Sequence, residues 1–159
     1  MSKQIKTNAM RLLERANIPY EPVYYDLGDM EFSGEAVSKL TGIPEKQSFK
    51  TLCAKGEKKG LTVFVVPVSG ELDVKAAALA AKDKRMEMLH VKDLLTHTGY
   101  VRGGVSPVGM KKQYPTYIDE SALGFDKIAI SAGARGSSML VAPEELARLL
   151  QAEFADILK

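Results

Sequence analysis

Cysteine is almost absent from this chain of 159 residues, in which Cys53 is the single example. One cysteine excludes an internal disulfide and every metal site that is built from several cysteines. Histidine is also scarce, because only His90 and His97 are present, and two histidines are too few for a histidine-rich metal cluster. We therefore expect no metal site, and no pattern in the sequence points to a cofactor.

A strong charge bias and long apolar runs are missing too. The 22 basic residues face 20 acidic ones, and this net charge of +2 is unlike that of proteins that bind nucleic acid unaided. RNA binding, if it occurs, should be weak or assisted by a partner. No stretch approaches the roughly 18 apolar residues of a membrane span. Residues 1–4 lead into an amphipathic pattern and not into the apolar run of a signal peptide. We expect a soluble, cytoplasmic protein outside the membrane.

The chain does have an ordinary globular balance, with 45% hydrophobic and 26% charged residues and no repeat or linker. One domain over residues 1–159 is expected. Periodicity predicts helices at residues 3–17, 34–40, 73–81, 91–98 and 144–158, and strands at residues 20–27, 48–55, 61–68, 127–131 and 137–141. Ser33 should cap the second helix and Gly42 should end it. This mixed order predicts an α/β (α+β) fold, a compact β-barrel-like domain with peripheral helices.

Lys50 lies inside an apolar strand pattern. A period of two places Lys50 on the face of Leu52 and Ala54, with Thr51 and Cys53 on the opposite face. Neither face has the composition of a solvated surface. The local pattern is consistent with a surface lysine at the strand edge or with a lysine in a pocket wall. A pocket lysine can bind a phosphate, a carboxylate or a developing oxyanion.

Two glycine-containing segments are further candidates. Residues 98–109 contain four glycines, which permit close backbone approach to a ligand but also suit a structural turn. Residues 131–136, Ser-Ala-Gly-Ala-Arg-Gly, are consistent with part of a binding site and equally with a hairpin that has one exposed arginine.

The remaining candidates are weaker. Cys53 is more simply explained as a buried structural thiol than as a nucleophile. Neither histidine has a Ser, Asp or Glu at a spacing typical of a catalytic pair. Two small basic clusters are either solvated faces or phosphate contacts: Lys82, Lys84 and Arg85, and Lys111 with Lys112.

Taken in order, these segments resemble the YbaK/EbsC family of aminoacyl-tRNA deacylases, which is similar to the editing domain of bacterial prolyl-tRNA synthetases. The resemblance extends over nearly the whole chain and is closest to the Cys-tRNA(Pro) deacylase branch. Its motifs are residues 49–52 (Phe-Lys-Thr-Leu), 66–68 with 72–75, 98–100, 103–109, 131–133 and 135–136.

The resemblance implies a site and a partner. Lys50 would hold the tRNA 3′ end, and Gly103 would supply catalytic backbone contacts. The substrate-binding residues would be Tyr25 and Phe32 at the aminoacyl pocket, Ser131 as a polar contact, and Thr51 and Gly104 as neighbours. Ser138 stands where relatives often carry an acidic residue, which puts the contact with the substrate amino group in doubt. The partners implied are tRNA(Pro) and prolyl-tRNA synthetase, with action in trans.

The resemblance also implies a mechanism that needs no protein nucleophile, since the substrate's cysteine thiol would attack its own ester. The sequence leaves open whether Cys-tRNA(Cys) is cleaved as well. One alternative is an editing enzyme for another small amino acid, such as Ala-tRNA(Pro), with water as the nucleophile. Another is a non-catalytic module that binds tRNA or a synthetase.

Overall fold

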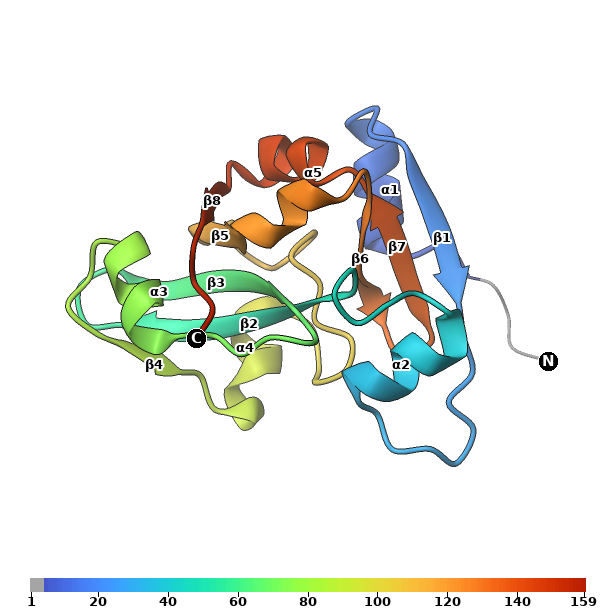
Figure 1. Cartoon of the computed structure of the whole chain (residues 1–159), viewed down its shortest axis with the longest axis horizontal. Coiled ribbons are helices and arrows are strands. Elements are labelled where there is room, and N and C mark those ends of the chain that lie inside the picture. The colour runs from blue at the N-terminus through green and yellow to red at the C-terminus, as the bar shows by residue number, and fades with distance from the viewer. Residues whose placement is uncertain (1–4) are drawn as a thin grey trace.

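The computed structural model describes residues 5–159, whose strands form two sheets (Figure 1). The first sheet has the order β1-β7-β6 and is antiparallel throughout. The second has the order β4-β2-β3-β5-β8, with antiparallel pairs among β4, β2 and β3 and parallel pairs to β5 and β8. The strands are β1 (Tyr20–Tyr24), β2 (Phe49–Gly56), β3 (Gly60–Pro67), β4 (Met86–Met88), β5 (Thr116–Asp119), β6 (Ile128–Ala134), β7 (Ser137–Val141) and β8 (Glu153–Ala155).

Short helices surround the sheets. They are α1 (Asn8–Arg15), α2 (Gly34–Thr41), α3 (Val74–Ala80), α4 (Leu94–Thr98) and α5 (Pro143–Leu150), with 3-10 turns η1 (Val91–Asp93) and η2 (Glu120–Gly124). The caps of α2 are as predicted. The Ser33 hydroxyl oxygen accepts a hydrogen bond from the Ala36 N–H, and Gly42 ends the helix in a left-handed conformation with φ 76°. No helix in residues 5–159 is long and apolar enough to cross a membrane.

The β2–β3 hairpin is covered on both faces, since both alternating sets of β3 side chains are apolar, with Val63 and Val65 on one side and Phe64 and Val66 on the other. One face, with Cys53 and Val65, lies in a core formed with α1, α5 and the first sheet. The other face, with Phe64 and Val66, packs against α3 in a second core. The two sheets meet at the start of β2, where Ser48 bridges Ala129 in β6. The mixed α/β fold is confirmed, but within residues 5–159 the strands form two joined sheets and no closed barrel.

Several predicted boundaries are wrong. The first helix spans Asn8–Arg15 and begins at the Thr7 cap, so residues 5–7 and 16–17 are not helical, while Lys3 and Gln4 lie outside the described residues. The predicted strand over residues 20–27 ends at Tyr24. The last helix ends at Leu150, because Gln151 adopts a left-handed conformation with φ 54°. The chain then pairs with β5 as β8, which uses backbone groups that a helix to Leu158 would consume.

Candidate functional site

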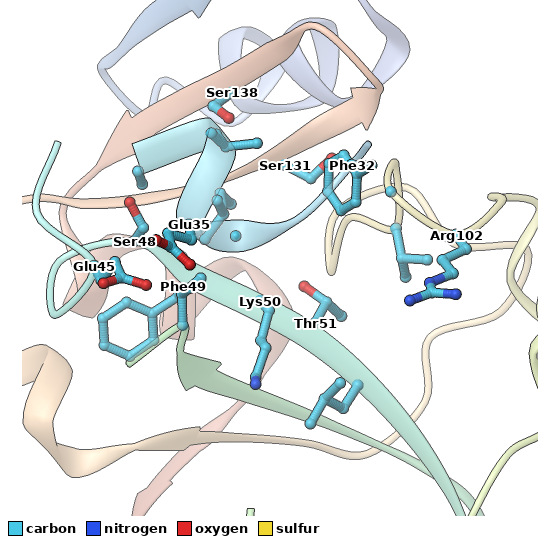
Figure 2. A pocket seen from close by; sticks show the side chains of 18 of the residues that line it. Phe32, Glu35, Glu45, Ser48, Phe49, Lys50, Thr51, Arg102, Ser131 and Ser138 are labelled. Atoms are coloured by element: carbon cyan, nitrogen blue, oxygen red, sulfur yellow. The ribbon is translucent and has the colours of Figure 1, made fainter. Parts of the chain in front are cut away.

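A cavity of about 570 Å³ lies where the two sheets, α2 and the glycine-rich loop meet. Its walls come from β2, from β6 and β7, from residues 25–45, from residues 88–94 and from the loop at residues 102–105. The cavity therefore gathers segments that are far apart in the sequence. Figure 2 shows several of these side chains, and Ser131, Ser138 and Phe32 lie together on one side of β2.

Lys50 and Thr51 project to opposite sides of β2 (Figure 2). The hairpin register places Lys50 opposite Val66 and Thr51 opposite Val65, which are on different faces of the sheet. Lys50 is half-buried at the cavity wall, and none of the ion pairs among residues 5–159 involves it. Its ammonium group is thus placed for an external anion.

Thr51 faces the side of the cavity that holds Phe32 and Ser131 (Figure 2). Its Oγ1 atom is buried and has no hydrogen-bond partner within the part of the chain that the structure describes. A buried hydroxyl without a partner costs free energy of about 1–3 kcal/mol. A ligand that hydrogen-bonds to Thr51 would recover that cost.

The edge of β2 next to Thr51 is not covered by β4. The Val68 N–H donates to the Ser48 carbonyl at 2.7 Å, so the even-numbered residues of β2 direct their backbone groups toward β3. The same alternation turns the N–H and C=O of Thr51 toward the opposite edge. There β4 pairs only with residues 54–56. This edge offers backbone hydrogen-bonding groups to the cavity.

The glycine-rich loop docks against β6 through close backbone contacts. A Cβ atom on Gly104 would lie 3.2 Å from the Ala134 Cα, and one on Gly133 would lie 2.8 Å from the Tyr100 ring. β6 is irregular between Ser131 and Ala134, so the loop meets a bulge. The two glycine-containing segments of the sequence are therefore parts of one structure.

Gly103 is held at the cavity by its conformation and by its neighbours. Its φ of +93° lies in the region that favours glycine, and a Cβ atom there would lie 2.5 Å from Arg135 Nε and 3.2 Å from Phe32 Cγ. Arg135 Cζ stacks 5.5 Å from the centroid of the Phe32 ring, while its Nε donates to the Arg102 carbonyl at 3.1 Å. Arg135 thus joins three segments at the cavity rim.

The polar wall opposite β2 consists of Ser131, Ser138 and Tyr25. Ser131 and Ser138 are register partners in β6 and β7, and Ser131 Oγ accepts from the Gly133 N–H at 3.1 Å. Burial raises the pKa of the Tyr25 phenol, while the Gly136 backbone, Arg135 and the Ser138 hydroxyl oppose that rise. Tyr25 is therefore a neutral hydrogen-bonding group at physiological pH.

The cavity offers no activated nucleophile. Cys53 is only 3% exposed, and burial raises the pKa of its thiol to about 11, so it stays protonated near neutral pH. His90 and His97 are exposed and do not line the cavity. Among residues 5–159, no group of three or more His, Cys, Asp and Glu side chains could hold a metal ion. The arrangement is suited to binding and charge stabilisation.

The structure gathers most of the predicted site residues in this cavity. Seven of them line it: Tyr25, Phe32, Lys50, Thr51, Gly103, Ser131 and Ser138. Gly104 does not line it, but it is buried directly behind the wall, against β6. Their roles toward a substrate remain predictions.

Sequence reasoning missed the part that Arg135 plays, since its local pattern is that of an exposed turn residue. It also missed Gly34, where an added Cβ would overlap the Val68 side chain. A glycine at the first position of α2 was the only local signal of this close contact between α2 and Val68, the residue that follows β3.

The chain is similar to several known proteins. The model of the aminoacyl-tRNA editing domain family matches residues 32–149. A protein of Enterococcus faecalis, EbsC, is 46% identical over 154 residues, which cover 97% of this chain and 94% of that protein. EbsC is named as a candidate Cys-tRNA(Pro)/Cys-tRNA(Cys) deacylase. YwhH of Bacillus subtilis is 27% identical over 112 residues, covering 70% of this chain and 71% of that protein.

A solved structure has the same fold. It is described as a candidate trans-editing enzyme for prolyl-tRNA synthetase, and the match has a TM-score of 0.83 with 23% identity and 99% coverage of both chains.

Proposed function

This chain belongs to the aminoacyl-tRNA editing domain family, and we propose that it is a deacylase that acts in trans on Cys-tRNA(Pro). The identity of 46% to EbsC over 97% of the chain supports this substrate, because the name of that relative includes Cys-tRNA(Pro) and Cys-tRNA(Cys). The likeness in fold to a candidate trans-editing enzyme for prolyl-tRNA synthetase supports an association with that synthetase.

The two sides of β2 suit the two parts of the substrate. Lys50 would bind a phosphate of the tRNA 3′ end, for which a lysine ammonium group is a suitable point charge. On the other side, Thr51, Ser131 and Ser138 would surround the aminoacyl group (Figure 2). Tyr25 and Phe32 would limit the size of the amino acid that this side accepts.

The loop at Gly103 would complete the pocket around the ester. A backbone with φ of +93° brings the loop against Phe32, and no larger residue fits there without displacing Arg135. On the uncovered edge of β2, the Thr51 N–H would donate a hydrogen bond to the developing oxyanion. One donor of this kind can contribute roughly 10²–10³-fold in rate.

The chemical step would use the nucleophile of the substrate. The cysteine sulfur forms a bond to the carbonyl carbon of its own ester, and the bond from that carbon to the ribose oxygen breaks. The thiol proton ends on the ribose oxygen, so that tRNA leaves with its hydroxyl restored and the amino acid leaves as a cyclic thioester. Positioning a nucleophile beside its target can lower the barrier by about 7 kcal/mol or more.

The observation that carries the proposal is the combination of this preformed cavity, whose walls bring Lys50, Thr51 and Ser131 together, with a buried, protonated Cys53. The test is deacylation of Cys-tRNA(Pro), of Ala-tRNA(Pro) and of Cys-tRNA(Pro) alkylated on sulfur, with and without prolyl-tRNA synthetase. We expect turnover of the first substrate only, enhanced by the synthetase. If no substrate is released, the chain is a binding module and the proposal fails.

Release of alanine instead would favour hydrolysis by water. One observation bears on this second candidate: Ser138 is buried in the cavity wall, at the position where relatives often carry an acidic residue that could contact the substrate amino group. Without that acidic residue, the site leaves room for a different amino-acid preference. The comparison of Cys-tRNA(Pro) with Ala-tRNA(Pro) decides between the two.

A further inference from the structure

The far end of the β2–β3 hairpin is rich in exposed basic residues. We call it the hairpin tip and define it as residues 55–59 and 82–87. Its basic residues, all exposed, are Lys55, Lys58, Lys59, Lys82, Lys84 and Arg85. Three acidic residues accompany them, so the tip carries a net +3 and the rest of the chain a net −1. The tip is therefore a basic surface at one end of the hairpin.

A buried carboxylate holds the two segments of the tip together. Asp83 accepts from the N–H groups of Lys59 at 2.7 Å, Lys84 at 2.7 Å and Lys58 at 3.1 Å. An added Cβ at Gly56 would overlap the Asp83 side chain, so only glycine fits there. The pKa of Asp83 is lowered, chiefly by the Lys59 N–H and also by the other backbone donors. The carboxylate is thus used to organise the backbone.

The lysine side chains of the tip remain available. Within the described residues, the single ion pair of the tip joins Arg85 to Glu57 at 3.9 Å, and the Arg85 side chain is 85% exposed. Asp83 is 9% exposed and is occupied by backbone donors, so it does not pair with a lysine ammonium group. Several cations are thereby presented on a fixed scaffold, which is the electrostatic pattern of a phosphate-binding surface.

The tip lies beyond the cavity along β2. β2 lines the cavity from Phe49 to Cys53 and reaches the tip at Gly56, which at about 3.3 Å per residue is roughly 20 Å from Lys50 and roughly 10 Å from Cys53. Figure 1 shows α3 and β4 at the left end of the molecule and α2 with the first sheet at the right. The tip therefore extends the protein surface beyond the cavity along β2.

We propose that the hairpin tip binds the phosphate backbone of the duplex next to the 3′ end of the tRNA, while the cavity holds the aminoacyl ester. The 3′ end of a tRNA is single-stranded for several nucleotides before its duplex begins. A protein that holds the terminal ester meets duplex phosphates only farther along its surface, where the tip lies. Double-stranded RNA is recognised largely through such backbone contacts. The inference rests on a tRNA substrate and is independent of the amino acid removed.

The test is the binding of uncharged tRNA(Pro) at several salt concentrations by the full chain and by the triple variant Lys58→Gln/Lys59→Gln/Lys84→Gln. These changes keep the backbone donors to Asp83. Affinity should fall roughly 3- to 150-fold at low salt if each exposed contact contributes about 0.2–1 kcal/mol. The slope of log affinity against log salt should decrease by about 2–3, since each lost phosphate contact contributes roughly 0.7–0.9.

A matched control removes the same charge elsewhere. Three basic residues outside the tip form ion pairs with glutamates: Lys6, Lys127 and Arg148. The triple variant Lys6→Gln/Lys127→Gln/Arg148→Gln should therefore keep the tRNA affinity and the salt slope of the wild type. A single-stranded oligonucleotide with the 3′-terminal sequence should bind the wild type and the tip variant equally. Thermal unfolding of each variant checks that it is folded.

Three outcomes would overturn the inference: unchanged tRNA binding by the tip variant, an equal loss in the control variant, or a loss of synthetase association with tRNA binding intact. The last would assign the tip to an acidic protein surface. Tip-dependent tRNA binding without deacylation of any substrate would instead refute the proposed function and leave the tip assignment standing.

Discussion

Arg135 covers the ring of Phe32, with its guanidinium carbon 5.5 Å from the ring centroid, and the same side chain donates to the Arg102 carbonyl at 3.1 Å. One arginine therefore connects the turn after β6, the segment before α2 and the glycine-rich loop. All three segments border the cavity, so their relative position depends on this contact.

Replacing Arg135 should loosen the cavity rim with little effect on global stability, because Arg135 is exposed. The cation–π contact contributes about 0.5–1 kcal/mol and the hydrogen bond about 0.5–1.5 kcal/mol. Arg135→Ala should therefore lower kcat/KM for Cys-tRNA(Pro) by roughly 5- to 70-fold. Arg135→Lys keeps the charge and should recover only part of the loss. Equal activity of Arg135→Ala and wild type would show that the contact does not position the site.

Gly103→Ala should impair activity more than Gly104→Ala. Gly103 has φ +93°, and its added methyl group would collide with Arg135 and Phe32, whereas a methyl group on Gly104 meets the Ala134 backbone at 3.2 Å without conformational strain. A left-handed conformation costs a non-glycine residue about 1–3 kcal/mol. Displacement of the loop by about 1 Å can reduce the rate 10²-fold. Steady-state deacylation by the two variants makes the comparison.

Lys50→Ala should weaken transition-state binding without unfolding the protein, since no ion pair among residues 5–159 depends on Lys50. A charge-assisted contact contributes about 1.5–3 kcal/mol, which corresponds to a fall in kcat/KM of roughly 10- to 150-fold. Lys46→Ala is the matched control, because Lys46 is exposed and does not line the cavity. A similar loss in both variants would argue against a specific role for Lys50.

The pH dependence of deacylation should report the thiol of the substrate. A free cysteine thiol has a pKa of about 8.5, so the rate should increase close to tenfold per pH unit below about pH 8. Cys53 does not titrate in this range, because burial raises its pKa to about 11. Cys53→Ala should therefore keep the pH profile of the wild type. A flattened profile in that variant would make Cys53 a participant after all.

Asp83→Asn should destabilise the hairpin tip in a pH-dependent manner. Backbone donors hold the pKa of Asp83 below its ordinary value of 3.8, so its carboxylate stabilises the fold above that pH. This contribution is lost as the pH falls through the lower folded pKa. The difference in unfolding free energy between wild type and Asp83→Asn should be largest above pH 5 and should shrink below pH 3.8. Urea unfolding at several pH values measures it, with Asp126→Asn as the exposed control.

Much of the fold could be predicted from the sequence because its signals are local. The Ser33 cap and the Gly42 stop of α2 follow from hydrogen bonding and backbone conformation within a few residues. The two apolar faces of β3 predict its burial between two cores. The strands β4, β5 and β8 have only three or four residues each, too few to show a period, and they exist because a neighbouring strand pairs with them.

The candidate site likewise has features that the sequence indicates and features that only the tertiary structure determines. Motif order within the chain was sufficient to indicate the family, and the family resemblance supplied the eight candidate residues. The alternation along β2 was sufficient to put Lys50 and Thr51 on different faces. Only the tertiary structure decided that Gly103 and Arg135 meet at Phe32, and that Asp83 gathers the lysines of the hairpin tip. Such contacts join residues that are tens of positions apart, and their energies depend on distances that local periodicity does not encode.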